Sequence, residues 1–240
     1  MSTLYASLFA DDASRLIAAG CFVLTVALYF ASKALYARYP SPWLTPLVSV
    51  PAVLAAIVLV AHIPYAVYFR DTRWLMWLLG PATVAFAVPI YEYRALLKQH
   101  WISLAVGVGV GVVVAVGGSL VLAKLLHLSP DLQRSLMTRS ISTPFALAVS
   151  DRIHAPRELT ALFVIATGVC GMLFGEIVLA LLPLRTRLAR GALFGAAAHG
   201  VGTAKARELG SEEGVVASLT MMIAGIVMVL AAPLLGFLPV

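Results

Sequence analysis

Residues 191–206 read GALFGAAAHGVGTAKA, a hydrophobic stretch of small side chains in which glycines closely follow His199. Apolar runs flank it at about 157–183 and 213–239. Each of these runs is long enough to cross a bilayer, because about 20 apolar residues in a helix suffice. The glycines predict a break in the helix at membrane depth. Irregular backbone at that depth has to be buried in protein or line a water-filled cavity, since unpaired backbone groups cannot face lipid.

Two further stretches have the same interrupted character. The first, near 74–92, contains LGPATVAFAVPIY, and the second, near 133–151, contains SISTPFALAVSD. Pro81 and Pro89 lack the amide donor that a continuous helix needs, and a Thr-Pro step opens the short apolar segment of the second stretch. We predict that all three stretches are broken or re-entrant helices and that they mark the candidate substrate site.

The rest of the chain consists of intact apolar runs. Beside the two already named, they lie at about 13–37, 44–69 and 100–126. With 61% hydrophobic and 12% charged residues and a mean hydropathy of +0.97, the chain cannot cover a water-exposed surface with polar groups. We therefore expect an all-α polytopic membrane protein with about 6–8 transmembrane helices, the number depending on whether each broken stretch crosses the bilayer or returns.

Broken and intact segments alternate along the chain. AFAV at Ala85–Val88 resembles ALAV at Ala146–Val149, and Thr and Pro precede both. Paired broken segments in two halves are typical of transporters built from repeats. We expect one integral membrane domain over residues 1–240, with repeat halves at about 1–126 and 127–240.

The charge pattern indicates membrane lipids rather than nucleic acid as the surroundings. Seventeen Lys and Arg stand against eleven Asp and Glu, and the basic residues fall mostly between the apolar runs, as helix anchors do at lipid headgroups. Because nearly every connection carries basic residues, the orientation in the membrane stays open. Cys21 and Cys170 lie inside apolar runs, so we expect neither a disulfide nor a metal site. We expect no cofactor, and the lack of a nucleophile–base pair argues against an enzyme.

Four hydroxyl residues lie where a broken helix would expose free backbone amides: Thr83, Ser142, Thr143 and Thr203. The N-terminus of a half-helix offers N–H donors and a partial positive charge, which suits a small carboxylate. We expect Thr83 and Thr143, with the amides around Ala82 and Ser142, to face such a carboxylate. The alternative is that these hydroxyls cap the breaks or bond back to their own helices.

His199 places a titratable ring beside flexible backbone at Gly200 and Gly202. We expect the segment from His199 to Thr203 to close the site from the second half of the chain. The ring could bind an anion when protonated or relay a proton. The alternative is a neutral histidine that hydrogen-bonds across two helices.

Glu176 lies inside an intact span, where a buried carboxylate costs about 2.5 kcal/mol or more. A proton-coupling or substrate role is one interpretation. The other is structural, because Arg185 and Arg187 are near enough in sequence for pairing, or the carboxylate reaches the headgroups. Lys205 has the same two interpretations, as part of the site or as an anchor at a helix end.

Glycine pairs at GxxxG spacing favour close helix packing. They are Gly107 with Gly111, Gly171 with Gly175, and Gly191 with Gly195. We expect a homodimer, although the same spacing serves packing within one chain equally well. The Gly-rich run at 107–118 lacks the Lys-Ser or Lys-Thr ending of a phosphate-binding loop.

Taken in order, these motifs resemble the LrgB family, which is also called CidB or YohK. The matching positions are Leu79–Ala85 with Val88 and Pro89, Ser140–Ala146, Leu159–Ala161 with Phe163, then Thr167, Gly168 and Gly171, and finally Arg190 and Gly191 followed by His199–Ala204. The resemblance covers most of the chain from about residue 40 onward. Glu176 and Lys205 have no assigned place in this pattern.

The resemblance implies a multi-pass protein of the bacterial inner membrane, often encoded beside a smaller LrgA- or CidA-like membrane partner. That partner is fused to an LrgB-like domain in the plastid glycolate/glycerate transporter, and the present sequence holds only the LrgB-like part. Bacterial relatives are linked both to pyruvate movement and to holin-like control of murein hydrolases. Our hypothesis is a secondary transporter, or its transport subunit, for small monocarboxylates such as pyruvate, glycolate or glycerate. The alternative is a holin- or antiholin-like regulator of autolysis.

Overall fold

The computed structural model describes residues 2–39, 41–85 and 87–238, and the side chains of residues 2–13, Pro42, Ala82 and Thr83 lie outside this description. The described residues form helices and turns, with no strand among them. They divide into two compact units, residues 1–81 and 82–240, and the boundary falls within α4 (Leu79–Ala85). The predicted all-α class is confirmed.

The first unit contains one long helix and two shorter ones. Its elements are α1 (Ser2–Arg38), the 3-10 helix η1 (Pro42–Leu44), α2 (Pro46–Val60) and α3 (Tyr65–Trp77). Helix α1 packs on both α2 and α3. The hydroxyls of Ser32 and Ser49 lie 2.6 Å apart across the α1–α2 contact, and Arg70 Nη1 donates to Ser14 Oγ at 3.2 Å. Polar pairs thus fix the register of helices that are otherwise apolar.

The span expected over 44–69 is not one helix, and this prediction was wrong. Helix α2 ends at Val60, and His62 adopts a left-handed conformation with φ 49°. The Ile63 amide donates to the Val58 carbonyl at 3.0 Å, which is the bond that closes a Schellman turn. Pro64 has no amide donor with which to continue α2, and it is instead the N-cap residue of α3. Hydropathy alone does not show such a turn.

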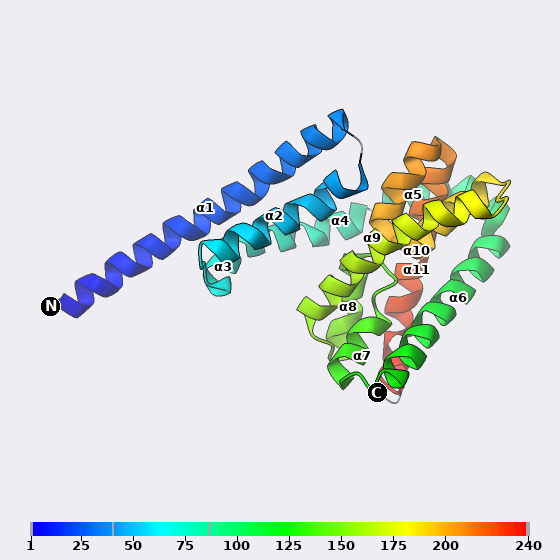
Figure 1. Ribbon diagram of the computed structural model, residues 1–240. Helices are drawn as coiled ribbons and strands as arrows, with labels where there is room; N and C mark the ends of the chain where they lie inside the picture. The colour runs from blue at the N-terminus through cyan, green and yellow to red at the C-terminus, as the bar shows by residue number, and fades with distance from the viewer. Residues whose placement is uncertain (1, 40, 86, 239–240) are drawn as a thin grey trace. The chain divides into compact units, whose positions relative to one another are not determined.

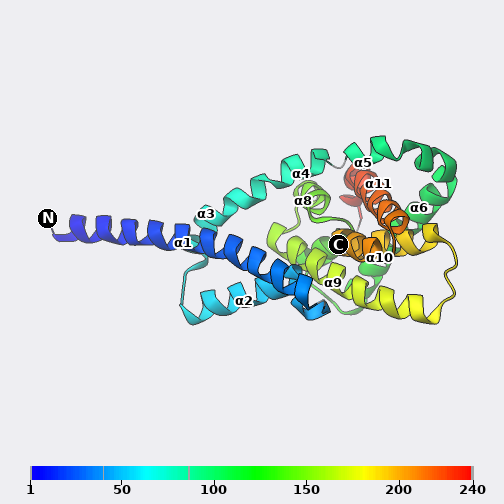
Figure 2. The same cartoon turned by 90° about the horizontal axis from the view of Figure 1, so that it is seen from above.

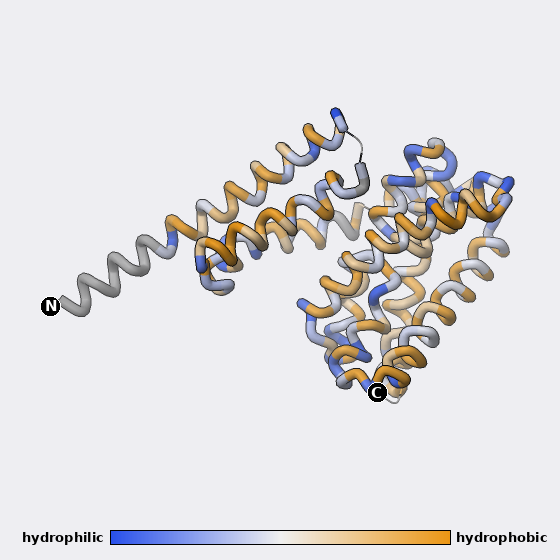
Figure 3. Tube along the Cα trace, viewed as in Figure 1, coloured by the Kyte–Doolittle hydropathy of each residue, from blue (hydrophilic) through white to orange (hydrophobic). Residues whose placement is uncertain are grey.

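The second unit carries most of the long helices. After α4 it contains α5 (Ala87–Glu92), α6 (Arg94–Leu125), α7 (Pro130–Met137), α8 (Thr143–Arg152), α9 (Arg157–Leu181), α10 (Arg187–Leu209) and α11 (Ser211–Leu235). Within the described chain, four helices are long and apolar enough to cross a membrane: Ser14–Arg38 of α1, α6, α9 and α11. Figure 3 shows hydrophobic residues along the bodies of these helices.

Many large apolar side chains on these helices point outward, as side chains facing lipid do. Examples at least half exposed are Val113, Val114, Leu122, Leu162, Leu181 and Leu230. The chain is therefore a multi-pass membrane protein.

The second and third predicted interruptions are present. In the first stretch a turn at Leu78 separates α3 from α4, whereas Pro81 and Pro89 lie inside the helical segments α4 and α5, and the boundary between these segments falls on Phe86, outside the described residues. The second is broken by residues 138–142, called the linker below, which separate α7 from α8. The third is broken inside α10 at His199, whose φ of 45° and ψ of −121° are not helical.

The first half of α10 runs antiparallel to α9. A Cβ added at Gly171 of α9 would collide with the Ala197 backbone, and one at Gly175 would press on the Phe194 ring. Residue numbers thus rise along α9 while they fall along α10. Both glycines of this GxxxG pair serve packing within the chain.

The same half of α10 runs parallel to α11. A Cβ at Gly191 would meet Val216, and one at Gly195 would collide with Ala217. This second GxxxG pair is also used within the chain, while a Cβ at Gly107 or Gly111 of α6 would meet nothing within 4 Å. Helices α9, α10 and α11 therefore form a tightly packed group (Figure 1, Figure 2).

Beyond His199, α10 turns back on itself. A Cβ at Gly202 would collide with the Phe194 carbonyl, and Phe194 shares a buried cluster with Ala206. Lys205 reaches Glu176 of α9 at 2.7 Å. The second half thus retraces the path of the first, so α10 is a re-entrant hairpin with its tip at His199, and it does not cross the membrane.

Helices α7 and α8 are also too short to cross. They contain 8 and 10 residues, which at 1.5 Å per residue is about 12 Å and about 15 Å against a bilayer core of about 30 Å. A turn closed by the Ala155 amide on the Ser150 carbonyl folds α8 against α9, so these two helices run antiparallel. Since α9 is also antiparallel to the first half of α10, α8 points the same way as α11.

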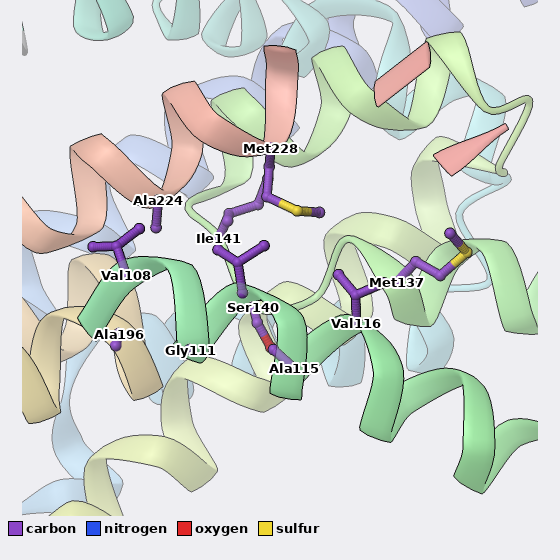
Figure 4. Close-up of a pocket in the computed structure, with 11 residues that line it drawn as sticks. Val108, Gly111, Ala115, Val116, Met137, Ser140, Ile141, Ala196, Ala224 and Met228 are labelled. Atoms are coloured by element: carbon purple, nitrogen blue, oxygen red, sulfur yellow. The ribbon is translucent and has the colours of Figure 1, made fainter. Parts of the chain in front are cut away.

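Helix α6 points that way too. In Figure 4, Val108 of α6 lies beside Ala224 of α11 at one end of a cavity, and Val116 and Met228 lie further along both helices. The C-terminal ends of α6 and α8 therefore lie on the same side, and α7 starts from that side. Helices α7 and α8 form a second re-entrant hairpin, which enters from the side opposite to α10.

Candidate functional site

The two hairpins meet inside the second unit. A cavity of about 20 Å³ lies between them, and its wall includes Ser140 and Ile141 from the linker and Ala196 from α10 (Figure 4). Helices α6 and α11 complete the wall with mostly apolar side chains. This volume accommodates one water molecule, not a carboxylic acid.

Arg139 lies in the linker, partly buried, at the tip of the α7–α8 hairpin. Its Nε donates to Ser119 Oγ of α6 at 2.9 Å, and its Nη1 donates to Thr167 Oγ1 of α9 at 3.4 Å. Across the described residues, no carboxylate lies within ion-pair distance of this guanidinium. A cation without a counter-charge at membrane depth is costly, so it marks a candidate ligand or ion site.

His199 forms the opposing tip. Its side chain is only 3% exposed, and its Nε2 atom has no hydrogen-bond partner in the structure. The ring and Arg139 interact electrostatically. A non-glycine residue with positive φ is strained, and strain of this kind concentrates at functional sites. The hydrogen bond from the ring to a second helix, which the alternative interpretation of His199 requires, is not seen for Nε2.

Ser142 and Thr143 open helix α8. Ser142 is 7% exposed, its hydroxyl makes no capping bond to α8, and its Oγ has no partner. Thr143 is the first helical residue and is partly buried. The capping role that we considered for Ser142 is therefore not seen. A buried hydroxyl without a partner is unusual and asks for a ligand or a water molecule.

Thr203, Gly200 and Gly202 shape the α10 tip. Thr203 Oγ1 donates to the His199 carbonyl at 2.8 Å, so this hydroxyl bonds back to its own helix. Gly202 allows the return of the chain against Phe194, whereas Gly200 is exposed and unconfined. These residues hold His199 in place, and the structure does not bring their side chains to the cavity wall.

Glu176 and Lys205 form an ion-pair cluster away from the tips. Lys205 Nζ lies 2.7 Å from Glu176 and 3.1 Å from Glu208, which joins α9 to the returning half of α10. The partner of Glu176 is thus Lys205 rather than Arg185 or Arg187. The side chains of Ala82 and Thr83, also expected at the site, lie outside the described residues.

Sequence reasoning missed Arg139, Ser119 and the role of Thr167. The signal for Arg139 was present, because it directly precedes the SISTPF motif inside a broken hydrophobic stretch, where a charged residue is itself a functional indication. Ser119 gives no such signal, since only the folded chain places it beside the linker. Among the described residues, no group of three or more His, Cys, Asp or Glu side chains comes together to hold a metal ion.

Comparison with known proteins relates nearly the whole chain to one family. The model of the LrgB-like family matches residues 25–238. The uncharacterized proteins YwbG and YxaC of Bacillus subtilis (strain 168) are similar to this chain. YwbG is 40% identical over 212 residues, with 88% of this chain and 94% of YwbG covered. YxaC is 32% identical over 216 residues, with 90% and 94% covered.

A further relative has a descriptive name. The holin-like protein CidB of Staphylococcus epidermidis is 29% identical over 213 residues, which covers 89% of this chain and 93% of CidB. No solved structure matches the chain. From the extent of the family match and the similarity to YwbG, the chain belongs to the LrgB-like family.

Proposed function

We propose that this protein is a secondary transporter, or the transport subunit of one, for small 2-oxo or 2-hydroxy monocarboxylates such as pyruvate, glycolate or glycerate. One observation carries the proposal. Two re-entrant hairpins enter from opposite sides, and their tips hold two buried polar atoms without partners, Ser142 Oγ and His199 Nε2. Both atoms lie at the hairpin tips, where a ligand or a water molecule would supply the missing partners.

The tips suit a small carboxylate. Helix α8 begins at Thr143, so the positive end of its dipole faces the linker and favours an anion there. The hydroxyl of Ser142 adds a donor or acceptor for a 2-hydroxy or 2-oxo group. The cavity beside the linker is lined mostly by apolar residues of α6 and α11, which favours a ligand with little further polarity.

Opening of the site requires movement of a hairpin. The cavity admits one water molecule, so a substrate enters only when one tip withdraws. The two hairpins enter from opposite sides. Withdrawal of α10 would therefore open the site to one side of the membrane, and withdrawal of the α7–α8 hairpin would open it to the other. This is the geometry that alternating access needs.

We also propose the setting of this activity. The family resemblance supports the bacterial inner membrane, an LrgA- or CidA-like membrane partner and no enzymatic reaction. A homodimer remains part of the proposal, although α9 and α10 use their GxxxG glycines within the chain.

Uptake into proteoliposomes tests the function. Purified protein, with and without an LrgA-like partner, would be reconstituted with internal pyruvate and supplied with labelled pyruvate or glycolate. We expect saturable exchange that unlabelled pyruvate inhibits. Exchange no faster than in empty liposomes, in both preparations, would contradict the proposal.

A second candidate is a holin- or antiholin-like regulator of murein hydrolase activity, which the name of the relative CidB favours. That function predicts release of entrapped dyes of many sizes and indifference to Ser142→Ala. A transporter instead retains the dyes, and its Ser142→Ala variant exchanges pyruvate with a raised KM. Dye release and pyruvate exchange measured on the same liposomes separate the two functions.

A further inference from the structure

The Arg139 guanidinium has N–H donors that the contacts in the structure do not use. A guanidinium has five N–H donors, and the structure gives partners to Nε and to Nη1, through Ser119 and Thr167. The remaining donors include both on Nη2. An Arg binds a carboxylate through two parallel N–H bonds, so these donors are the ones that a carboxylate would use.

The contacts of Arg139 orient its side chain without neutralising it. Ser119 Oγ donates to the Ala115 carbonyl at 2.6 Å, so the hydroxyl proton is engaged and a lone pair is left for Arg139 Nε. Thr167 contributes a second neutral oxygen from α9. Helices α6 and α9 thus hold the guanidinium in place while its charge stays without a counter-ion.

One positive charge is available at the tips. Lys205, on the other hairpin, is already paired with Glu176 and Glu208. The groups nearest the linker are neutral hydroxyls, the His199 ring and apolar side chains. A second carboxylate on a ligand would be buried here without a partner, which is strongly unfavourable.

We propose that Arg139 binds the carboxylate of the substrate and, as the one uncompensated cation among the described residues of the hairpin tips, selects monocarboxylates over dicarboxylates. This inference rests on the proposed function and assigns a residue and a charge preference to its site. Ser119 and Thr167 are positioning residues, which act by orienting the guanidinium.

Direct binding tests the inference without relying on transport. Binding of pyruvate, glycolate and the dicarboxylate malonate would be measured by calorimetry on full-length protein in detergent. We expect pyruvate or glycolate to bind at least tenfold more tightly than malonate. Arg139→Gln should weaken monocarboxylate binding about 10- to 100-fold, the range for a hydrogen-bonded charged group, and Arg139→Lys should recover part of it because the charge remains.

Arg152→Gln is the matched control, since it removes an exposed arginine from the same hairpin and should leave binding unchanged. If Arg139→Gln does not fold, Ser119→Ala still loosens the guanidinium and should weaken binding severalfold. Wild-type affinity in folded Arg139→Gln, or equal affinity for malonate and pyruvate, would overturn the inference. So would a lack of any monocarboxylate binding by the wild type.

Exchange in liposomes on the same variants separates the two proposals. If the wild type binds pyruvate through Arg139 but exchanges none, the transport function fails and the inference stands. If the wild type exchanges pyruvate and Arg139→Gln does so with the same KM, the inference fails and the function stands.

Discussion

Lys205 on the returning half of α10 lies 2.7 Å from Glu176 of α9, and this ion pair ties the second hairpin to an intact span. The side chains are 25% and 40% exposed, so the protein encloses the pair only in part. Glu176→Gln should therefore reduce the free energy of unfolding by only about 0.5–1 kcal/mol, as partly exposed pairs do. Pyruvate exchange should persist.

Thermal unfolding in detergent and exchange in liposomes check this prediction together. Glu208→Gln is the control, since it removes the other partner of the same lysine. Complete loss of exchange with unchanged stability would instead give Glu176 a coupling role, which is the functional interpretation of this residue from sequence.

The glycines at the α10 tip should differ sharply in their tolerance of a methyl group. Gly202→Ala places a Cβ against the Phe194 carbonyl, so it should cost about 1–3 kcal/mol of stability, as overpacking does. Gly200→Ala meets nothing within 4 Å and should change stability by less than about 0.5 kcal/mol. Melting temperatures of the two variants provide the measurement, and equal values would contradict the tight hairpin.

The broken helices could be predicted because their causes are local. The glycines beside His199 and the Thr-Pro step at Thr143 are local signals of a weakened helix, although the break in α10 is at His199 itself. The turn at His62 was missed because hydropathy continues across it, although Pro64 two residues further on is a sequence signal for a helix end. His127 and His154 also have positive φ just beyond the ends of α6 and α8, so this use of histidine recurs along the chain.

The direction of the hairpins could not be predicted. Helix α10 returns because Gly202 packs on Phe194 and Lys205 pairs with Glu176. The sequence around each of these residues does not indicate its partner. The same limit applies to Ser119, which becomes part of the site only because α7 folds back along α6.

Replacement of His199 separates backbone strain from side-chain function. Its positive φ is accessible to glycine without strain, whereas alanine retains the penalty of about 1 kcal/mol or more. Both substitutions remove the ring, so His199→Gly should be about 1 kcal/mol more stable than His199→Ala, and both should exchange pyruvate poorly. Denaturant or thermal unfolding of the pair measures the difference, and a less stable glycine variant would contradict the strained conformation.

Ser142→Ala distinguishes a ligand-binding hydroxyl from a structural one. Because Ser142 Oγ is buried without a partner and makes no cap to α8, its removal takes away no hydrogen bond from the structure. Leaving a buried polar group unsatisfied costs about 1–3 kcal/mol, so the alanine variant should be as stable as the wild type or more stable. The same change should raise the KM for pyruvate exchange, since the open site then lacks a partner for the 2-oxo or 2-hydroxy group. Ser218→Ala is a suitable control, because that buried hydroxyl already donates to the Gly214 carbonyl at 2.9 Å within α11. If Ser142→Ala lowered the melting temperature and left the KM unchanged, the hydroxyl would belong to the fold rather than to the site.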